Sequence, residues 1–342
     1  MRAAVYYNNK DVRLEEMPTP KIENDEILIR VMASGICGSD VMEWYRIKKA
    51  PLVLGHEIAG EIIEVGQGIE RYKAGDRVSA SHHVPCNTCH YCLSDRHTVC
   101  DTLRSTTFDP GGFAEYVRLP AINADRGVYP LPDEISYEEA TFVEPLACVL
   151  RSQRIARLRP GQSVLVVGSG MTGLLQIHLA RASGAGRIIA TDISEYRLEA
   201  AGRFGADDVI DAREDVPARV RDLNGGRLVD LALVCTGAVG AITQALESVD
   251  RGGVAMLFAP TDPGLTIPVS VNDLFFSRGV TLTTSYAGSP ADHMTAMELI
   301  RAGDVGVRDM ISHRLSLEET ALGFEIVAGA KESMKVVIEP QR

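Results

Sequence analysis

The sequence has no cluster of positive charge. Lysine and arginine form nothing longer than short pairs such as Lys48–Lys49, and the formal net charge is −11. A nucleic-acid surface needs grouped cations that displace counterions from phosphates, and an anionic membrane attracts the same kind of surface. We therefore expect neither a nucleic acid nor a membrane as a partner.

Long apolar runs are also missing. The longest, such as Val164–Val167 and Val254–Ala259, are far shorter than the roughly 20 residues that a membrane-spanning helix requires. The first residues, MRAAVYYNNK, turn polar too early to contain the apolar region of a signal peptide. These features predict a cytoplasmic protein.

Repeats and low-complexity tracts are absent as well, and the composition is that of a globular protein. The 342 residues include 45% hydrophobic and 24% charged side chains, and this length is ample for two domains. Residues 1–147 contain short β-branched runs, Glu26–Ser34 and Glu57–Val65, which are separated by turn residues. We expect this part to form a β-rich domain.

The pattern changes near residue 148, where apolar runs begin to alternate with helical stretches. Runs that are apolar at successive positions are typical of a parallel sheet covered on both faces. We expect a doubly wound α/β domain over residues 148–283, with elements at Ser163–Val167, Leu174–Ser183, Arg187–Thr191, Glu195–Phe204, Leu231–Cys235 and Val254–Phe258. Residues 284–342 would complete the first domain, with the last strand, Met334–Ile338, rejoining its sheet.

A glycine-rich turn, GSGMTG at residues 168–173, follows the first strand of this α/β domain. A lone G-x-G-x-x-G pattern is weak, but here a strand precedes it, a helix follows it and an acid lies beyond it. The glycines allow a tight turn and a close approach of a pyrophosphate, which the free N–H groups of a helix N-terminus attract. We predict a dinucleotide site that includes Gly168, Gly170, Met171, Thr172 and Gly173.

Asp192 ends the next expected strand, nineteen residues after Gly173. A carboxylate at this place accepts hydrogen bonds from the adenosine ribose hydroxyls and repels a 2′-phosphate, which favours NAD over NADP. The alternative is that Asp192 only caps the next helix. Further candidate cofactor contacts are Arg197, Cys235 and Thr236.

Four of the seven cysteines lie within fifteen residues, in the pattern C-x2-C-x2-C-x7-C. In a reducing compartment such a group indicates a metal rather than disulfides. Four thiolates fill the tetrahedral shell of a structural zinc ion. The predicted ligands are Cys86, Cys89, Cys92 and Cys100, whereas Cys148 and Cys235 lie in apolar runs that suggest core positions.

Cys37 and His56, nineteen residues apart, are two further candidate zinc ligands. Taken alone, such residues are more often simply packed in a core. Their surroundings are more specific: GICGSD spans residues 35–40, and residues 55–69 read GHEIAGEIIEVGQGI before GDRV at residues 75–78. These motifs match the G-H-E-x2-G-x5-G-x2-hydrophobic pattern, and from Cys37 to the last strand the chain resembles the zinc-containing medium-chain dehydrogenase/reductase family.

The resemblance implies a GroES-like catalytic domain with an inserted Rossmann domain, and a zinc- and NAD-dependent alcohol dehydrogenase. Cys37 and His56 would bind the catalytic zinc, with either Glu57 or Glu144 as the third ligand. Simple alcohol dehydrogenases of the family carry a cysteine where this chain has Glu144, so the chain is more similar to the sorbitol and threonine dehydrogenase branch. This similarity favours a polyol, sugar or amino alcohol as substrate, and a simple secondary alcohol or a diol is the alternative.

In the implied mechanism, zinc lowers the pKa of a bound hydroxyl before hydride passes to the nicotinamide. Ser39 is expected to accept the first proton, or else to cap the next helix, and Asp40 to orient the imidazole ligand. The family often has a histidine five residues after the ligand cysteine, where this chain has Met42. Glu43, Tyr45 or water are the alternatives for the proton relay.

Two other functions compete with this hypothesis. A zinc-free quinone or enoyl reductase needs no Cys37–His56 pair, and a zinc ribbon that binds nucleic acid or protein does not account for the dinucleotide motif. A protein that binds zinc and NAD without turnover is a further alternative. The family resemblance implies a homo-oligomer, a tetramer or a dimer. Candidate substrate-pocket residues are Trp44, Tyr45, Arg104 and Phe108.

Overall fold

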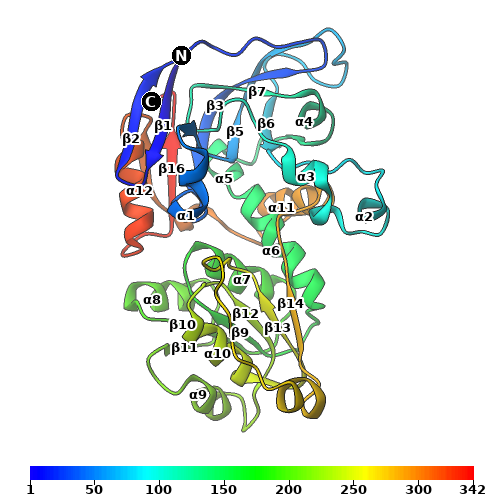
Figure 1. Cartoon of the computed structure of the whole chain (residues 1–342), viewed down its shortest axis with the longest axis vertical. Helices are drawn as coiled ribbons and strands as arrows, with labels where there is room; N and C mark the ends of the chain where they lie inside the picture. The colour runs from blue at the N-terminus through cyan, green and yellow to red at the C-terminus, as the bar shows by residue number, and fades with distance from the viewer. The chain divides into compact units, whose positions relative to one another are not determined.

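The computed structural model describes residues 1–342, and the chain divides into two compact units (Figure 1). The first unit comprises Met1–Ala147 and Ala287–Arg342, and the second comprises Cys148–Tyr286. The sequence predicted that the inserted domain ends at residue 283. This boundary falls inside strand β14 (Thr281–Thr284), one residue before the strand ends. Thr284 still pairs with the neighbouring strand of the same sheet, so the second unit continues beyond it.

The first unit is built on a seven-stranded sheet in the order β15-β16-β3-β5-β6-β8, with β7 beside β3. The prediction that the last strand rejoins this sheet is confirmed, because Val337 pairs with Gly35. Side chains such as Ile29, Ile58 and Val78 form its buried core. The strands are β3 (Ile27–Gly35), β5 (Glu57–Val65), β6 (Arg77–Ser81), β7 (Tyr116–Leu119), β8 (Val128–Pro130), β15 (Ile311–Ser316) and β16 (Lys335–Glu339).

A smaller three-stranded sheet and short helices complete the first unit. The sheet has the order β2-β1-β4, with β1 (Arg2–Asn8), β2 (Asp11–Glu16) and β4 (Leu52–Val53). The helices are α1 (Glu43–Arg46), η1 (Ile47–Lys49), α2 (His90–Leu93), η2 (His97–Val99), α3 (Asp101–Ser105), α4 (Ala121–Arg126), α5 (Tyr137–Ala140), α11 (Pro290–Ala302), η4 (Arg308–Met310) and α12 (Thr320–Gly329). Helix α6 (Val143–Ala156) begins in this unit and continues into the second.

The second unit is a six-stranded sheet in the order β11-β10-β9-β12-β13-β14, and every neighbouring pair is parallel. Both faces of its central strand are covered, since all four residues of Val164–Val167 are buried. The strands are β9 (Val164–Val167), β10 (Ile188–Asp192), β11 (Asp208–Asp211), β12 (Val229–Val234), β13 (Val249–Leu257) and β14. The helices are α7 (Met171–Ala182), α8 (Glu195–Arg203), α9 (Val216–Leu223), α10 (Val239–Ser248) and η3 (Val271–Ser277).

The predicted α/β class and doubly wound sheet are confirmed, with small differences at the ends of elements. Helix α7 starts at Met171, earlier than the predicted Leu174, because the helix begins directly after the glycine turn. No helix of the chain is both long enough and apolar enough to cross a membrane.

Candidate functional site

The pairing of β3 with β5 brings three zinc-ligand types together in the first unit. Cys37 lies just beyond the end of β3, His56 lies just before β5, and Glu57 is the first residue of β5, opposite Gly35. The Cys37 sulfur, a His56 ring nitrogen and a Glu57 carboxylate oxygen all lie within 4.8 Å of one another. A thiolate, an imidazole and a carboxylate on one centre suit zinc, whose bonds to such atoms are about 2.0–2.3 Å long.

Asp40 fixes the orientation of this group. Its Oδ2 accepts the backbone N–H of Cys37 at 3.0 Å, and its Oδ1 lies 3.3 Å from His56 Nδ1. Burial opposes the charge of Asp40, but the neighbouring His56 and Arg46 lower the pKa of its carboxyl. Because Nδ1 faces Asp40, the other ring nitrogen of His56 remains for a metal.

The two candidate third ligands differ in their surroundings. Glu57 is fully buried, its Oε2 forms an ion pair with Lys335, and its Oε1 has no hydrogen-bond partner. Glu144 lies in the first turn of α6 and is partly buried. Glu57 therefore belongs to the cluster in the first unit, and its unpaired buried oxygen is an atom that a metal ion would satisfy.

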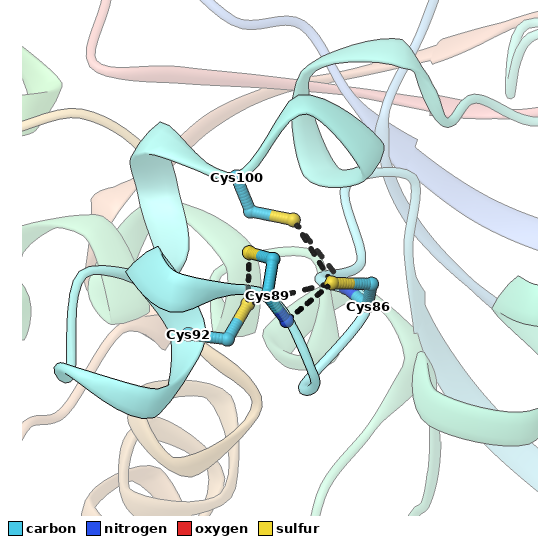
Figure 2. Close-up of side chains that lie close together, drawn as sticks. All are labelled: Cys86, Cys89, Cys92 and Cys100. Carbon is cyan, nitrogen blue, oxygen red and sulfur yellow. Dashed lines mark hydrogen bonds between the residues drawn. The ribbon is translucent and has the colours of Figure 1, made fainter.

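The four clustered cysteines form a second metal-type centre (Figure 2). The sulfur of Cys92 lies 3.9 Å from that of Cys86 and 3.6 Å from that of Cys89, and Cys100 lies 3.6 Å from Cys86. Four sulfurs around one zinc, with Zn–S bonds of about 2.3 Å, would be about 3.8 Å apart. The geometry therefore fits a closed zinc site with no open position.

The thiols of this cluster are unequal. Hydrogen bonds from Thr88 and from the backbone of Cys89 lower the pKa of Cys86 to about 5. Burial and the neighbouring thiol of Cys89 raise the pKa of Cys92 to about 12. A bound zinc ion displaces the protons of such thiols, so zinc binding to this cluster depends on pH.

In the second unit, the predicted cofactor residues meet at the carboxyl edge of the parallel sheet. Gly168 follows β9 with φ of +89°, and a Cβ on Gly173 would collide with the carbonyl oxygen of Gly168. Gly170 is the N-cap of α7 and provides no side-chain cap, so N–H groups at this helix end are left for an anion. Cys235 and Thr236 follow β12, the strand next to β9, and Thr236 lies beside Gly168.

Asp192, at the end of β10, links the glycine turn to β10 through hydrogen bonds. Its two oxygens accept the backbone N–H groups of Ser169 at 2.8 Å and Ser194 at 3.0 Å, and Arg197 Nη1 lies 3.9 Å away. The N-cap of α8 is Ser194, so Asp192 is not the capping residue that the alternative required. A carboxylate has about four lone-pair sites, so Asp192 retains room for ribose hydroxyls.

Comparisons with known proteins identify both units. The chain matches the family model of the alcohol dehydrogenase GroES-like domain over residues 23–133 and that of the zinc-binding dehydrogenase over residues 172–302. Sorbitol dehydrogenase of Bacillus subtilis is 34% identical, over 100% of this chain and 98% of the relative. The chain belongs to the zinc-containing medium-chain dehydrogenase family.

Other members of this dehydrogenase family resemble the chain over almost its whole length. L-threonine 3-dehydrogenase of Bacillus licheniformis is 34% identical, over 95% of this chain and 94% of the relative. The solved structure of 2R,3R-butanediol dehydrogenase from Bacillus subtilis has a TM-score of 0.86 and 28% identity, and 99% of each chain is covered. The predictions of a zinc- and nicotinamide-dependent alcohol dehydrogenase and of its fold are confirmed at this level, and the zinc-free reductase and zinc-ribbon alternatives are not supported.

One residue of the dehydrogenase site was not identified from the sequence. Arg46, at the end of α1, donates from Nη2 to Ser39 Oγ at 3.0 Å and from Nε to the Ser39 carbonyl at 2.9 Å. The expected relay candidates lie elsewhere: Glu43 accepts from the backbone of Asn9, and the exposed Tyr45 ring lies under the Arg46 guanidinium. A single arginine with no motif around it gives no sequence signal.

A histidine pair beside the dehydrogenase's metal site was also missed. The ring of His82 lies 4.8 Å from that of His56 and 3.8 Å from that of His83. Burial, His83 and His56 lower the pKa of His82, which keeps its ring neutral, and its Nδ1 is buried without a partner. Phe108, a candidate pocket residue, is 5% exposed and packs in the core against His82.

Proposed function

We propose that this dehydrogenase interconverts a secondary alcohol and a ketone on a polyol, a sugar or an amino alcohol, with NAD as the hydride carrier. The observation that carries the proposal is the Cys37–His56–Glu57 cluster, in which a carboxylate stands beside one thiolate. A carboxylate donates less electron density to a zinc ion than a second thiolate would, and it offers oxygen atoms near a polar substrate. The sorbitol, threonine and butanediol dehydrogenases among its relatives support the same substrate class.

The protein's own residues perform the positioning and the proton handling. When bound, zinc activates the substrate hydroxyl and NAD accepts the hydride. Cys37 and His56 hold the ion, with Glu57 or Glu144 as the third ligand, and Asp40 fixes the imidazole. Ser39 Oγ takes the substrate proton and releases its own towards water, while Arg46 keeps the hydroxyl oriented and stabilises negative charge on its oxygen. The four cysteines Cys86, Cys89, Cys92 and Cys100 would hold the structural zinc.

NAD rather than NADP is proposed because of Asp192. Its buried carboxylate stands at the end of β10, where the adenosine ribose of a dinucleotide lies in such folds. The negative charge of Asp192 would repel a 2′-phosphate at this place. Arg197, beside Asp192, is near enough to contact a ribose. Gly168, Gly170, Met171, Thr172 and Gly173 would hold the pyrophosphate, and Cys235 and Thr236 would line the adjacent edge.

A cytoplasmic, homo-oligomeric enzyme is proposed as well. The cluster of four cysteines must stay reduced in order to bind zinc, and a reducing compartment provides this. A dimer or tetramer is inferred from the family resemblance alone. Light scattering on the purified protein measures the number of subunits directly.

The test is a substrate panel with zinc-replete protein. Sorbitol, xylitol, 2,3-butanediol, L-threonine and 2-propanol are each offered with NAD or with NADP, and the absorbance of the reduced nicotinamide is followed. We expect turnover with polyols, diols or threonine, with NAD preferred over NADP. The C37S variant, which lacks one catalytic ligand, is the matched control and should be inactive while it still binds NAD.

Faster turnover of 2-propanol than of every polyol, diol and amino alcohol would replace the proposed substrate class with a simple alcohol. Zinc and NAD binding without turnover of any compound would favour the non-catalytic alternative. Activity of C37S equal to that of the wild type would contradict the metal site itself.

A further inference from the structure

The loop before His56 carries three cations in four residues, although the whole protein has a net charge of −11. Arg46 ends helix α1, and Lys48 and Lys49 lie in the turn η1 that follows it. Both lysines are exposed, and neither forms an ion pair with a carboxylate. A group of like charges without counter-charges attracts anions to the surface beside it.

One aromatic ring holds two of these cations close together. The guanidinium carbon of Arg46 lies 4.7 Å from the centre of the Tyr45 ring, and Lys49 Nζ lies 5.8 Å from the same centre. The ring attracts each cation, but two like charges at one ring repel each other. Glu43 of the same helix does not offset them, since it accepts the backbone N–H of Asn9. A bound anion would reduce this repulsion.

A series of contacts connects these two cations with the proposed metal site. Arg46 Nη2 donates to Ser39 Oγ at 3.0 Å and lies 3.4 Å from Asp40 Oδ1. The same Asp40 oxygen lies 3.3 Å from His56 Nδ1. The Tyr45 ring and Arg46 therefore link Lys49 to the side chains that surround the metal ligands.

The charge of Lys49 also acts on the histidine pair of this site. Burial and His56 lower the pKa of His83 to about 4, and the positive charges of Arg46 and Lys49 contribute to the decrease. Exposed charges farther apart than about 10 Å are largely screened by salt. Lys49 therefore lies near His83, whose neighbour His82 has its ring 4.8 Å from that of His56.

Other charged groups of this region already have partners. Asp40 pairs with Arg46, and Glu57 forms an ion pair with Lys335. A zinc ion held by one thiolate would add further positive charge. Lys49 has no carboxylate of its own, so the surroundings of the substrate have an excess of positive charge.

We propose that Lys49 is a specificity-determining residue, and that the substrate alcohol carries an anionic group, a phosphate or a carboxylate, which the Lys49 ammonium binds. This inference rests on the proposed function and narrows its substrate class to polyols, sugars or amino alcohols with a negative charge. The metal site takes the hydroxyl and Lys49 takes the anion, and both belong to the first unit. Binding at two points orients the carbon that loses the hydride.

Pairs of alcohols that differ in one anionic group test this proposal. Sorbitol is compared with sorbitol 6-phosphate, and L-threoninol with L-threonine, each with zinc-replete protein and NAD. We expect the anionic member of one pair to have a kcat/KM at least about tenfold higher than its neutral partner, the effect of one hydrogen bond to a charged group. The pair that shows this advantage identifies phosphate or carboxylate. A wild-type enzyme without the advantage in either pair overturns the proposal.

The variant K49M removes the charge, and K48M is the matched control at the next position. We expect K49M to lower the ratio of anionic to neutral kcat/KM about 5–10-fold, between the effects of an exposed ion pair and a charged hydrogen bond. K48M should keep the wild-type ratio, and K49R should restore most of it. Equal effects of K48M and K49M on this ratio would refute the role of Lys49.

Binding of inorganic phosphate provides a readout that needs no turnover. With NAD bound, the pyrophosphate site is occupied, so calorimetric titration with phosphate reports on the substrate side. We expect K49M to bind phosphate about 5–10 times more weakly than the wild type or K48M. Equal affinity of K49M and the wild type, or no phosphate binding by the wild type, overturns the proposal.

The two possible failures are distinguishable. If alcohols are oxidised without any preference for an anion, the role of Lys49 is wrong and the proposed function stands. If no alcohol is oxidised but phosphate binding depends on Lys49, the proposed function is wrong and the anion site stands.

Discussion

Ser39 contacts both a proposed metal ligand, through its backbone, and a cation, through its hydroxyl. Its backbone N–H lies 3.4 Å from the Cys37 sulfur, and its Oγ accepts from Arg46, which also lies 3.4 Å from Asp40 Oδ1. A guanidinium group has no acceptor and keeps its proton at every physiological pH. Arg46 therefore cannot replace the histidine of a proton relay, but it can orient Ser39 and stabilise charge on its oxygen while water takes the proton onward.

We expect R46M to lower kcat while the NAD dissociation constant and the zinc content stay unchanged. Removing a donor aimed directly at developing charge costs about 10²–10³ in kcat. Arg46 acts through Ser39 and is not placed against the substrate, so we expect a smaller loss of about tenfold in kcat. Steady-state kinetics with zinc analysis measures the effect, and R46K, which keeps the charge, should lose less. A wild-type kcat in R46M would contradict this role.

Neighbouring parallel strands are not connected by a tight turn, and in this protein side-chain hydrogen bonds help to link them. Asp230 of β12 accepts the backbone N–H and the hydroxyl of Ser163, just before β9, each at 2.8 Å. Arg227 also donates to its carboxylate, at 3.2 Å. Burial opposes the charge of Asp230, but the two hydrogen bonds from Ser163 and the nearby Arg227 lower the pKa of its carboxyl.

We expect D230N to lower the free energy of unfolding by about 1–2 kcal/mol at pH 7. This is below the roughly 1.5–3 kcal/mol typical of hydrogen bonds to charged groups, because the Asp230 side chain is partly exposed. Because the folded pKa is lowered, this contribution is present above the unfolded value of about 3.9 and is lost as the pH falls through the folded pKa. Urea unfolding of D230N and the wild type from pH 7 to about pH 3 should therefore show curves that converge in acid. A difference independent of pH would mean that packing, and not the charge, is responsible.

Across the whole molecule, the features that the sequence predicted are those that depend on short motifs and on local periodicity. The glycine turn with Asp192, the four-cysteine spacing and the alternating strands and helices each lie within one stretch of chain. Lys335 and Glu57 are 278 positions apart, and only the pairing of β16 with β3 and of β3 with β5 brings them together. His82 reaches His56 in the same way, through the pairing of β5 with β6. Contacts of this kind depend on strand order, which neither composition nor spacing reveals.

The two units differ in how much of their stability a structural metal would supply. The segment with the four cysteines has a small apolar core, whose buried members are Leu103, Cys92 and Cys100, so a metal would supply much of its stability. The second unit has its own large core and carries all the predicted NAD contacts.

We therefore expect C92S to hold one zinc fewer per chain and to unfold at a lower temperature. The decrease should be at least roughly 2–4 °C, the shift that a loss of 1 kcal/mol in the free energy of unfolding causes in a domain of 150–250 residues. NAD binding, measured by calorimetry, should persist with an unchanged dissociation constant, because the second unit keeps its core. The C148S variant alters a cysteine outside the cluster and should keep both zinc ions. Loss of NAD binding in folded C92S would show that the glycine turn depends on the metal-bearing segment, and an unchanged zinc content would remove Cys92 from the ligand set.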